Sequence, residues 1–257
     1  MRRVSNSPQQ IILFAFGLCL AASVIFFGVT KAAPIKQEPP PDPKLESVYG
    51  DAPVQLSIDN QVCLSCHGQP GVSMTLDNGE VWDLYVPAEA HQNSVHGQSG
   101  YACVQCHTQV GDYPHPPFSA KDARDASLKL YNACIRCHAF QYEAGQDSAH
   151  SIAQSSGNRD AAICTDCHTA HDVRRIYEPQ TRDMLFDARV WIPQTCARCH
   201  STIYEKYKES VHGAALIGEG NPDVPTCTDC HGSHTIQDPT TSAFRLKSPD
   251  ICAKCHT

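Results

Sequence analysis

The longest apolar stretch of the chain lies near its N-terminus. Residues 11–30 form a run of twenty residues without a charged side chain, and Arg2 and Arg3 precede it. Such a run is long enough for a helix to cross a bilayer, and basic residues before it place the N-terminus in the cytoplasm. The pattern predicts a transmembrane anchor over 11–30 after a cytoplasmic segment, 1–10. A signal peptide cut near Lys31 remains an alternative.

The segment that follows has the composition of a spacer. Residues 31–57 contain six of the eighteen prolines, and proline-rich segments form semi-rigid linkers. Strand-like alternation then appears once, over residues 72–86. Asn78-Gly79 lies between the two halves of that stretch and is a type I′ turn signal, so a β-hairpin is predicted there.

Helical patterns occupy much of the remainder. Residues 87–95 predict a helix with Pro87 at its first position and Gly97 as its stop. Residues 201–211 carry Ile203, Tyr204, Tyr207 and Val211 on one side of a second helix. The predicted fold class is therefore mainly α with much irregular structure, one short β-hairpin and an N-terminal transmembrane helix.

Cysteine and histidine change this picture, because they recur in one motif. The sequence contains seven copies of Cys-x-x-Cys-His, whereas chance gives roughly 0.05. Zinc sites do not need a histidine after every second cysteine, and a disulfide framework needs none. The motif is the attachment site of a c-type haem: the thiols bind the vinyl groups and the histidine binds the iron. The copies are Cys63-Cys66-His67, Cys103-Cys106-His107, Cys134-Cys137-His138, Cys164-Cys167-His168, Cys196-Cys199-His200, Cys227-Cys230-His231 and Cys252-Cys255-His256.

The other seven histidines are candidate distal iron ligands, one for each haem. Met1, Met74 and Met184 are the only methionines, and none lies close to a motif. Two axial imidazoles leave no open iron position, which favours electron transfer over substrate binding. The candidates are His96, His115, His150, His171, His212, His234 and His91, of which His91 is the weakest.

The motifs repeat with a regular spacing from Cys134 onward. The separation of Cys134 from Cys196 is nearly the same as that of Cys164 from Cys227. This period predicts repeated two-haem units. The predicted divisions are a first haem unit with the hairpin inserted over 58–133, two-haem units over 134–195 and 196–251, and a terminal haem motif over 252–257.

Helix geometry predicts which haem a distal histidine does not serve. If residues 201–211 are helical, His212 lies about 18 Å from His200 along the helix axis. Two ligands of one iron are much closer, so His212 serves a different haem. By repetition, His150 also serves a haem other than the one whose motif ends at His138.

Shorter spacings give a similar prediction. His171 and His234 each lie three residues beyond a motif histidine, which is too near to reach the opposite face of the same haem. In the first unit, His115 is expected to take their place. The last motif, at His256, needs a distal ligand from upstream or from a partner.

These motifs resemble the multihaem c-type cytochromes of the cytochrome c3-like, doubled Cys-x-x-Cys-His kind. The resemblance covers about 58–257 and includes the Ser-Val-His-Gly that begins at Ser210, before Cys-Thr-Asp-Cys-His-Gly-Ser-His. It implies electron transfer in the periplasm or at the cell surface of bacteria. The anchored layout is also similar to the NapC/NirT-type quinol dehydrogenases, but the motif at Cys63 lacks the nearby methionine of that family.

The sequence therefore predicts a heptahaem cytochrome with seven covalently bound haems c. Electrons are expected to pass from a membrane donor, a quinol-oxidising or cytochrome b-type complex, to a periplasmic or extracellular redox partner. The N-terminal helix would hold the protein at the extracytoplasmic face of the membrane. A formal charge of −7 excludes a strongly basic nucleic-acid surface.

Two alternatives stay open. One is a reductase of nitrite, hydroxylamine or sulfur oxyanions, which needs one haem with an open iron face. The other is a homo-oligomer, as a subunit of a polymerised cytochrome filament. Electron transfer without a substrate site of its own is the preferred interpretation.

Overall fold

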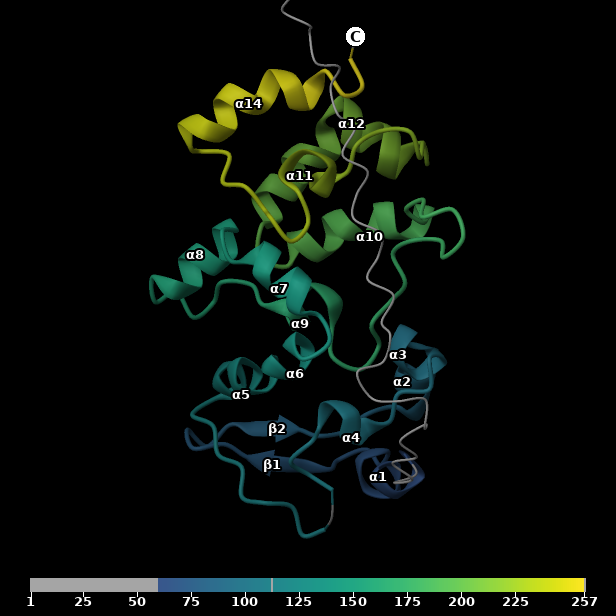
Figure 1. Ribbon diagram of the computed structural model, residues 1–257, viewed down its shortest axis with the longest axis vertical. Helices are drawn as coiled ribbons and strands as arrows, with labels where there is room; N and C mark the ends of the chain where they lie inside the picture. The colour runs from purple at the N-terminus through teal and green to yellow at the C-terminus, as the bar shows by residue number, and fades with distance from the viewer. Residues whose placement is uncertain (1–59, 112, 257) are drawn as a thin grey trace, which may run out of the picture. The chain divides into compact units, whose positions relative to one another are not determined.

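The computed structural model describes residues 60–111 and 113–256 (Figure 1). Helices dominate this part of the chain, and one antiparallel strand pair interrupts them. The elements are α1 Asn60–His67, β1 Ser73–Thr75, β2 Val81–Asp83, α2 Ala88–Asn93, α3 Val95–Gln98, α4 Cys103–Cys106, α5 Ala123–Leu130, α6 Asn132–Ile135, α7 Ala139–Gly145, α8 Ala149–Ser155, α9 Cys164–His168, α10 Phe186–Ala197, α11 Ser201–Glu209, α12 Val211–Gly213, the π-helix η1 Ala214–Gly218, α13 Cys227–His231 and α14 Ser242–Cys252.

The mainly helical class with one short hairpin is confirmed, but the transmembrane part of the predicted fold class is corrected. Among residues 60–111 and 113–256, no helix is long and apolar enough to cross a membrane. The longest of these helices, α10, has 12 residues, whereas a bilayer needs about twenty. The predicted span 11–30 and its flanking segments, 1–10 and 31–57, lie outside the described residues.

The hairpin forms where the alternation predicts it, but with a different turn. A type I′ turn needs positive φ at both central residues, and of Asn78 and Gly79 only Gly79 has it, at +86°. The Gly79 N–H donates to the Leu76 carbonyl at 2.9 Å, and the Leu76 N–H donates to the Glu80 carbonyl at 2.8 Å. This is a three-residue loop, in which a type I turn is followed by a left-handed glycine.

Apolar side chains form only a small core. Leu76, Ala120 and Ala126 are buried together beside Trp82, whose ring centroid lies 6.0 Å from that of Phe118. In the part of the chain that the structure describes, eight hydrophobic residues are buried, and four of them are alanines. So little burial cannot by itself hold a domain of this size.

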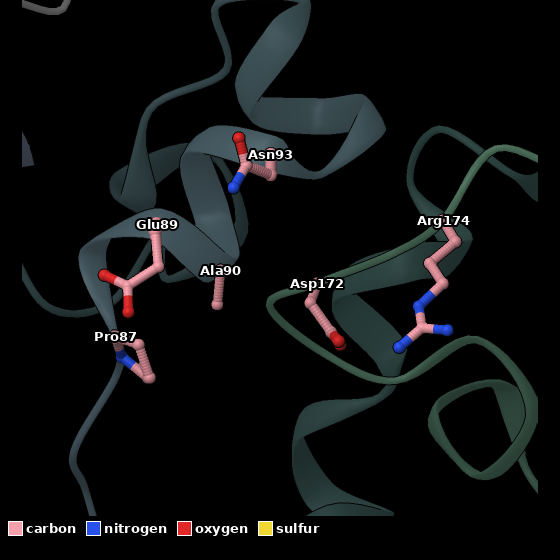
Figure 2. Close-up of a pocket in the computed structure, with 6 residues that line it drawn as sticks. All are labelled: Pro87, Glu89, Ala90, Asn93, Asp172 and Arg174. Atoms are coloured by element: carbon pink, nitrogen blue, oxygen red, sulfur yellow. The ribbon is translucent and has the colours of Figure 1, made fainter.

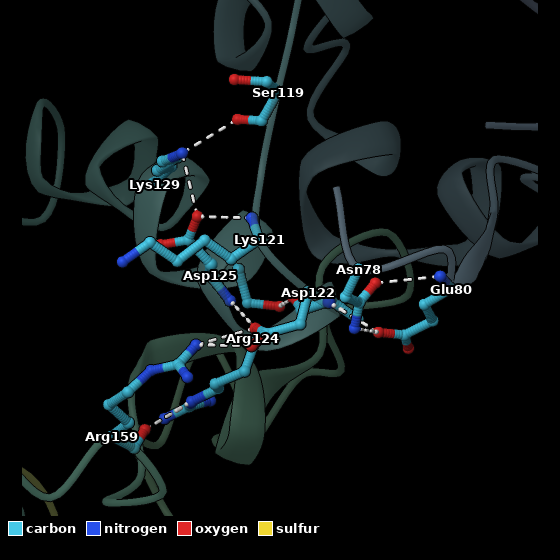
Figure 3. Close-up of polar contacts among 11 residues, drawn as sticks. Asn78, Glu80, Ser119, Lys121, Asp122, Arg124, Asp125, Lys129 and Arg159 are labelled. Carbon is cyan, nitrogen blue, oxygen red and sulfur yellow. Dashed lines mark hydrogen bonds and ion pairs between the residues drawn. The ribbon is translucent and has the colours of Figure 1, made fainter. Parts of the chain in front are cut away.

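Polar contacts join the hairpin loop to α5 (Figure 3). Asp122 caps α5 by accepting the N–H of Asp125 at 2.7 Å. The carboxylate of Glu80 accepts the N–H of Ala123 at 3.1 Å, and Arg159 donates to Asp122 at 2.7 Å. The hairpin, α5 and the segment after α8 are therefore fixed to one another by side chains that satisfy helix-end donors.

Candidate haem sites

Six of the seven motif histidines lie against a histidine from outside the motifs. If an iron atom binds one imidazole nitrogen on each face at about 2 Å, the two ring centroids lie about 6 Å apart. The observed separations fit that arrangement. They are 6.1 Å for His67 and His115, 6.0 Å for His107 and His171, 6.1 Å for His138 and His96, 6.1 Å for His168 and His234, 6.1 Å for His200 and His150, and 5.9 Å for His256 and His212.

Most of these pairs follow two sequence rules. His96, His150 and His212 lie before their partners, with one complete motif between the two histidines. His171 and His234 lie after theirs, and each pairs with a motif histidine two motifs before the one that it follows. Both rules connect segments that are distant in the sequence, so each two-haem unit contributes histidines to its neighbours.

His115 follows neither rule. Its ring lies against His67, one motif earlier, and not two motifs earlier like His171 and His234. The expectation that His115 replaces those two residues therefore holds for its position after a motif but not for the motif with which it pairs.

A serine two residues earlier positions each histidine of the first rule. Its hydroxyl accepts a backbone N–H and begins a new short helix. The helices predicted over 87–95 and 201–211 are consequently broken before the histidine, at Ser94 and Ser210. The sequence analysis missed this role, although Ser-x-His in three copies signals it. The acceptor–donor distances are 3.0 Å for Ser94 and Gly97, 3.2 Å for Ser148 and Ser151, and 3.1 Å for Ser210 and Gly213.

Two motif histidines are also oriented by backbone carbonyls. Nδ1 of His67 lies 3.0 Å from the Leu84 carbonyl oxygen, and Nδ1 of His231 lies 3.4 Å from that of Gln237. A donor hydrogen on Nδ1 leaves Nε2 with the lone pair that binds a metal.

Motifs two, four and six each begin a short helix. The residue before the second cysteine accepts the backbone N–H that precedes the motif, which is half of a capping box. In motifs four and six, Arg124 and Arg189 bind these acceptors, Asp166 and Asp229, at 2.8 and 3.0 Å. The capping distances are 2.6 Å for Gln105 and Ala102, 2.7 Å for Asp166 and Ile163, and 2.8 Å for Asp229 and Thr226.

Successive motifs meet through their cysteines in two alternating ways. In the first way, the first cysteines of two motifs touch. A hydrogen bond between Cys134 and Cys164 raises the pKa of Cys134 and lowers the pKa of Cys164 to about 7. The same kind of contact joins Cys63 to Cys103 and Cys196 to Cys227.

In the second way, the second cysteine of one motif lies near the cysteines of the next. Burial raises the pKa of Cys167, and the thiols of Cys196 and Cys199 raise it further. Cys106 has the same relation to Cys134 and Cys137, and Cys230 to Cys252 and Cys255. The two kinds of contact together link all seven motifs in one series.

The histidines paired at the second and fourth motifs favour their neutral form. Burial is the main cause that lowers the pKa of His107, His168 and His171, and a neighbouring histidine lowers it further. The neutral imidazole is the form that binds metals.

Two histidines remain outside the six pairs. Among the described residues, His91 lies against no motif histidine. Its neighbours are His96 and His171; burial lowers the pKa of both, and the nearby His91 lowers it further. The ring of His231 lies instead against Phe244, at 5.3 Å between centroids and 9° between planes.

One cavity adjoins a motif, and another does not. One, of about 320 Å³, is lined by Cys167, His168, Trp191 and Arg198, among others, and therefore adjoins the fourth motif. The other, of about 370 Å³, lies between α2 and the segment that follows His171 (Figure 2). Neither cysteine nor histidine lines this second cavity, so it offers an iron no ligand.

Two family models match the chain. One, described as cytochrome c3, matches residues 95–181 and covers motifs two to four. The other, described as cytochrome c7 and related cytochrome c, matches residues 184–257 and covers motifs five to seven. No curated protein and no solved structure matches the chain. With these matches over six of its motifs, the chain belongs to the multihaem c-type cytochromes of the cytochrome c3-like family, which bind haem c covalently and transfer electrons.

Proposed function

We propose that the chain holds seven haems c and carries electrons along them in the order of the motifs. The observation that supports this proposal best is the set of six histidine pairs, all with centroids 5.9–6.1 Å apart. One member of each pair belongs to an attachment motif and the other comes from a distant segment. Chance packing would not give six pairs of the same separation and the same composition.

Each haem would be held by two cysteines and two histidines. The two cysteines of the motif would attach it, and the motif histidine and the second histidine of the pair would both bind its iron. Each bound haem supplies an iron that alternates between the ferric and ferrous states and so holds one electron. With a histidine on each side of the iron, the six paired sites would leave no room there for a substrate.

The contacts between successive motifs support a continuous path. Each motif lies near the next through its cysteines, from Cys63 to Cys255. Haems attached to these neighbouring cysteines would therefore lie close together, as electron transfer between them requires.

The donor, the acceptor and the compartment are also part of this proposal. Haem c is attached outside the cytoplasm, which supports an extracytoplasmic location. We expect a quinol-linked membrane complex as donor and a periplasmic or extracellular redox protein as acceptor. A formal charge of −7 supports partners with a basic docking patch.

Intact mass and the pyridine haemochrome assay test the haem count. Seven haems per chain are expected, and each haem should titrate as a one-electron centre in a spectroelectrochemical titration. A count of six or fewer in fully matured protein would contradict the proposal. His67→Ala should leave the haem mass unchanged but perturb one haem spectrum, since the cysteines still attach it.

A further inference from the structure

The fourth motif is the most shielded of the seven. It is the only motif in which neither cysteine nor the histidine is exposed. Cys167 is partly buried, whereas the second cysteine of every other motif is exposed. Ile163, directly before the motif, is 7% exposed. A haem attached here would therefore have less water around its attachment edge than a haem at any other motif.

The cavity of about 320 Å³ that adjoins this motif carries positive charge. Arg174 and Arg198 line it together with Cys167 and His168. Neither guanidinium group forms an ion pair with a carboxylate of the described residues. The two arginines therefore bring positive charge to the fourth site that no direct contact neutralises.

Nearby carboxylates offset only part of this charge. Asp166, inside the motif, binds Arg124 at 2.8 Å and so has a cation of its own. Asp172 and Arg174 both line the other cavity (Figure 2), but they form no ion pair there. Asp172 therefore weakens the field of Arg174 without cancelling it, and Arg198 should have the larger effect.

Arg198 belongs to a repeated arrangement. Burial raises the pKa of the Cys167 thiol, and the nearby charge of Arg198 opposes that rise. In the third and seventh motifs, Arg136 and Lys254 have the same relation to the second cysteine of the motif before them. The second, fourth and sixth sites thus each have one cation that the next motif supplies.

Arg174 is the second cation, and it distinguishes the fourth site from the sixth. The segments after the two identical pentapeptides are aligned, because the carbonyls of Val173 and Ile236 accept equivalent N–H groups at 2.9 and 2.8 Å. The next residue is Arg174 at the fourth site and Gln237 at the sixth. Gln237 is uncharged and donates to the Thr235 carbonyl at 2.8 Å. The fourth site therefore has two cations where the sixth has one.

We propose that Arg174 and Arg198, together with the shielding of the motif, give the fourth haem the highest reduction potential of the seven. The inference rests on the proposed seven-haem arrangement. Reduction adds one electron, from the donor proposed above, to ferric iron and forms or breaks no bond. It removes one positive charge from the haem, so nearby cations and the exclusion of water both favour the ferrous form. The first electron to enter the chain is therefore held at the fourth haem until it passes to the third or the fifth.

A potentiometric titration of the full chain with its haems tests the role of the arginines. Arg174→Gln and Arg198→Gln should each lower the equilibrium constant of the highest-potential step, by up to about tenfold, which corresponds to about 59 mV for one electron. Because salt screens exposed charges, the difference from the wild type should shrink between about 0.01 M and about 1 M salt. Arg175→Gln is the matched control, since Arg175 does not line the cavity, and it should leave this step unchanged. An unchanged highest step in both Arg174→Gln and Arg198→Gln overturns the proposal.

Two further variants locate the step. C164A/C167A should lose one haem and the highest-potential step together, and retention of that step overturns the assignment. If this protein fails to fold, His234→Ala labels the fourth haem with a high-spin EPR signal, because His234 lies against His168. Adding Arg174→Gln to His234→Ala should lower the potential at which this signal is lost, whereas adding Arg175→Gln should not. An equal potential in the two double variants overturns the proposal.

The haem count separates this inference from the proposed function. Mass and pyridine haemochrome of the wild type give the number of haems per chain. Seven haems with a highest step that does not respond to the arginines overturn the role of the fourth site alone. A count other than seven contradicts the proposed function itself.

Discussion

The fourth and sixth motifs have the same five residues, Cys-Thr-Asp-Cys-His, and nearly the same local structure. Both form a five-residue helix, α9 and α13. Each aspartate accepts the N–H before its motif and binds an arginine from a preceding helix, Arg124 at the fourth motif and Arg189 at the sixth. Identical short sequences with identical caps therefore give the same platform for haem attachment.

What lies opposite the motif histidine is different. His168 lies against His234, and His231 lies against Phe244. The local sequence decides how a haem is attached, whereas a residue about one repeat away decides whether its iron is closed. The two sites thus form a natural comparison between a motif histidine that faces a second histidine and one that faces a phenyl ring.

Removing His234 should make the fourth site resemble the sixth. His234→Ala should add one high-spin haem and one bound carbon monoxide per chain to those of the wild type, since His234 lies against His168. In the wild type, the iron bond of His234 closes the long loop from His168 to His234. A cross-link over such a loop contributes at most about 4 kcal/mol to the free energy of unfolding, and the variant loses this contribution. EPR and guanidinium unfolding of the haem protein measure both effects.

His91→Ala is the matched control, because His91 lies against no motif histidine in the described chain. It should leave both the spin state and the stability unchanged. A low-spin fourth haem in His234→Ala would mean that another residue ligates it, and the pairing would then be wrong.

The two arginines should differ in the stability that they provide. Arg124 Nε donates to the Arg159 carbonyl at 2.7 Å, in addition to the contact with Asp166. Nε of Arg189 is buried and has no partner in the part of the chain described. Because each hydrogen bond to a charged group contributes about 1.5–3 kcal/mol, Arg124→Ala should destabilise the protein by about 3 kcal/mol and Arg189→Ala by less.

Denaturant unfolding of the two variants, followed by Soret absorbance, gives the comparison. Arg124→Lys serves as the control, since it keeps the charge but not the forked geometry. Equal losses in Arg124→Ala and Arg189→Ala would show that the additional bond contributes nothing.

The residue after the shared pentapeptide gives a smaller test. Thr169 and Gly232 are equivalent, and both have positive φ, +64° and +81°. Such a conformation costs a β-branched residue about 1–3 kcal/mol. Thr169→Gly should therefore stabilise the protein by about 1 kcal/mol, and Gly232→Thr should destabilise it by about 2 kcal/mol.

A close contact at Gly232 adds to the loss of stability expected for Gly232→Thr. A Cβ at Gly232 would lie 2.9 Å from Oγ1 of Thr235. Thermal unfolding measures both shifts, and Thr169→Ala is a control that keeps a Cβ at the strained position. A stability loss in Thr169→Gly would contradict the strain argument.

The sequence predicted what depends on nearby residues. The hairpin followed from alternation around Asn78-Gly79, and the helical class followed from periodicity. The turn type was wrong because Asn78 keeps a negative φ while Gly79 alone takes the left-handed conformation. The transmembrane helix rested on residues 11–30 and lies outside the described chain, in which no helix could span a membrane.

The pairing of histidines could be predicted only in part. Spacing excluded the nearest haem for His150 and His212, but it did not identify the partner, because that depends on how segments far apart in the sequence pack. For the same reason, the sequence analysis singled out His256 as the motif histidine without an assigned distal ligand. The structure brings His212 to His256 and leaves His231 beside Phe244.

The smallest expected effect concerns the serine that precedes His150. Ser148 is 5% exposed, and its hydroxyl accepts the Ser151 N–H at 3.2 Å. Replacing a serine cap by alanine costs about 1 kcal/mol, and replacing it by glycine costs a few tenths. Ser148→Ala should therefore lower the unfolding free energy by about 1 kcal/mol, and Ser148→Gly should lower it by only a few tenths of a kcal/mol. Because the cap orients only His150, the EPR signal of the haem at His200 should be the one that shifts. A change confined to the seventh site would refute this prediction, since the serine there is Ser210.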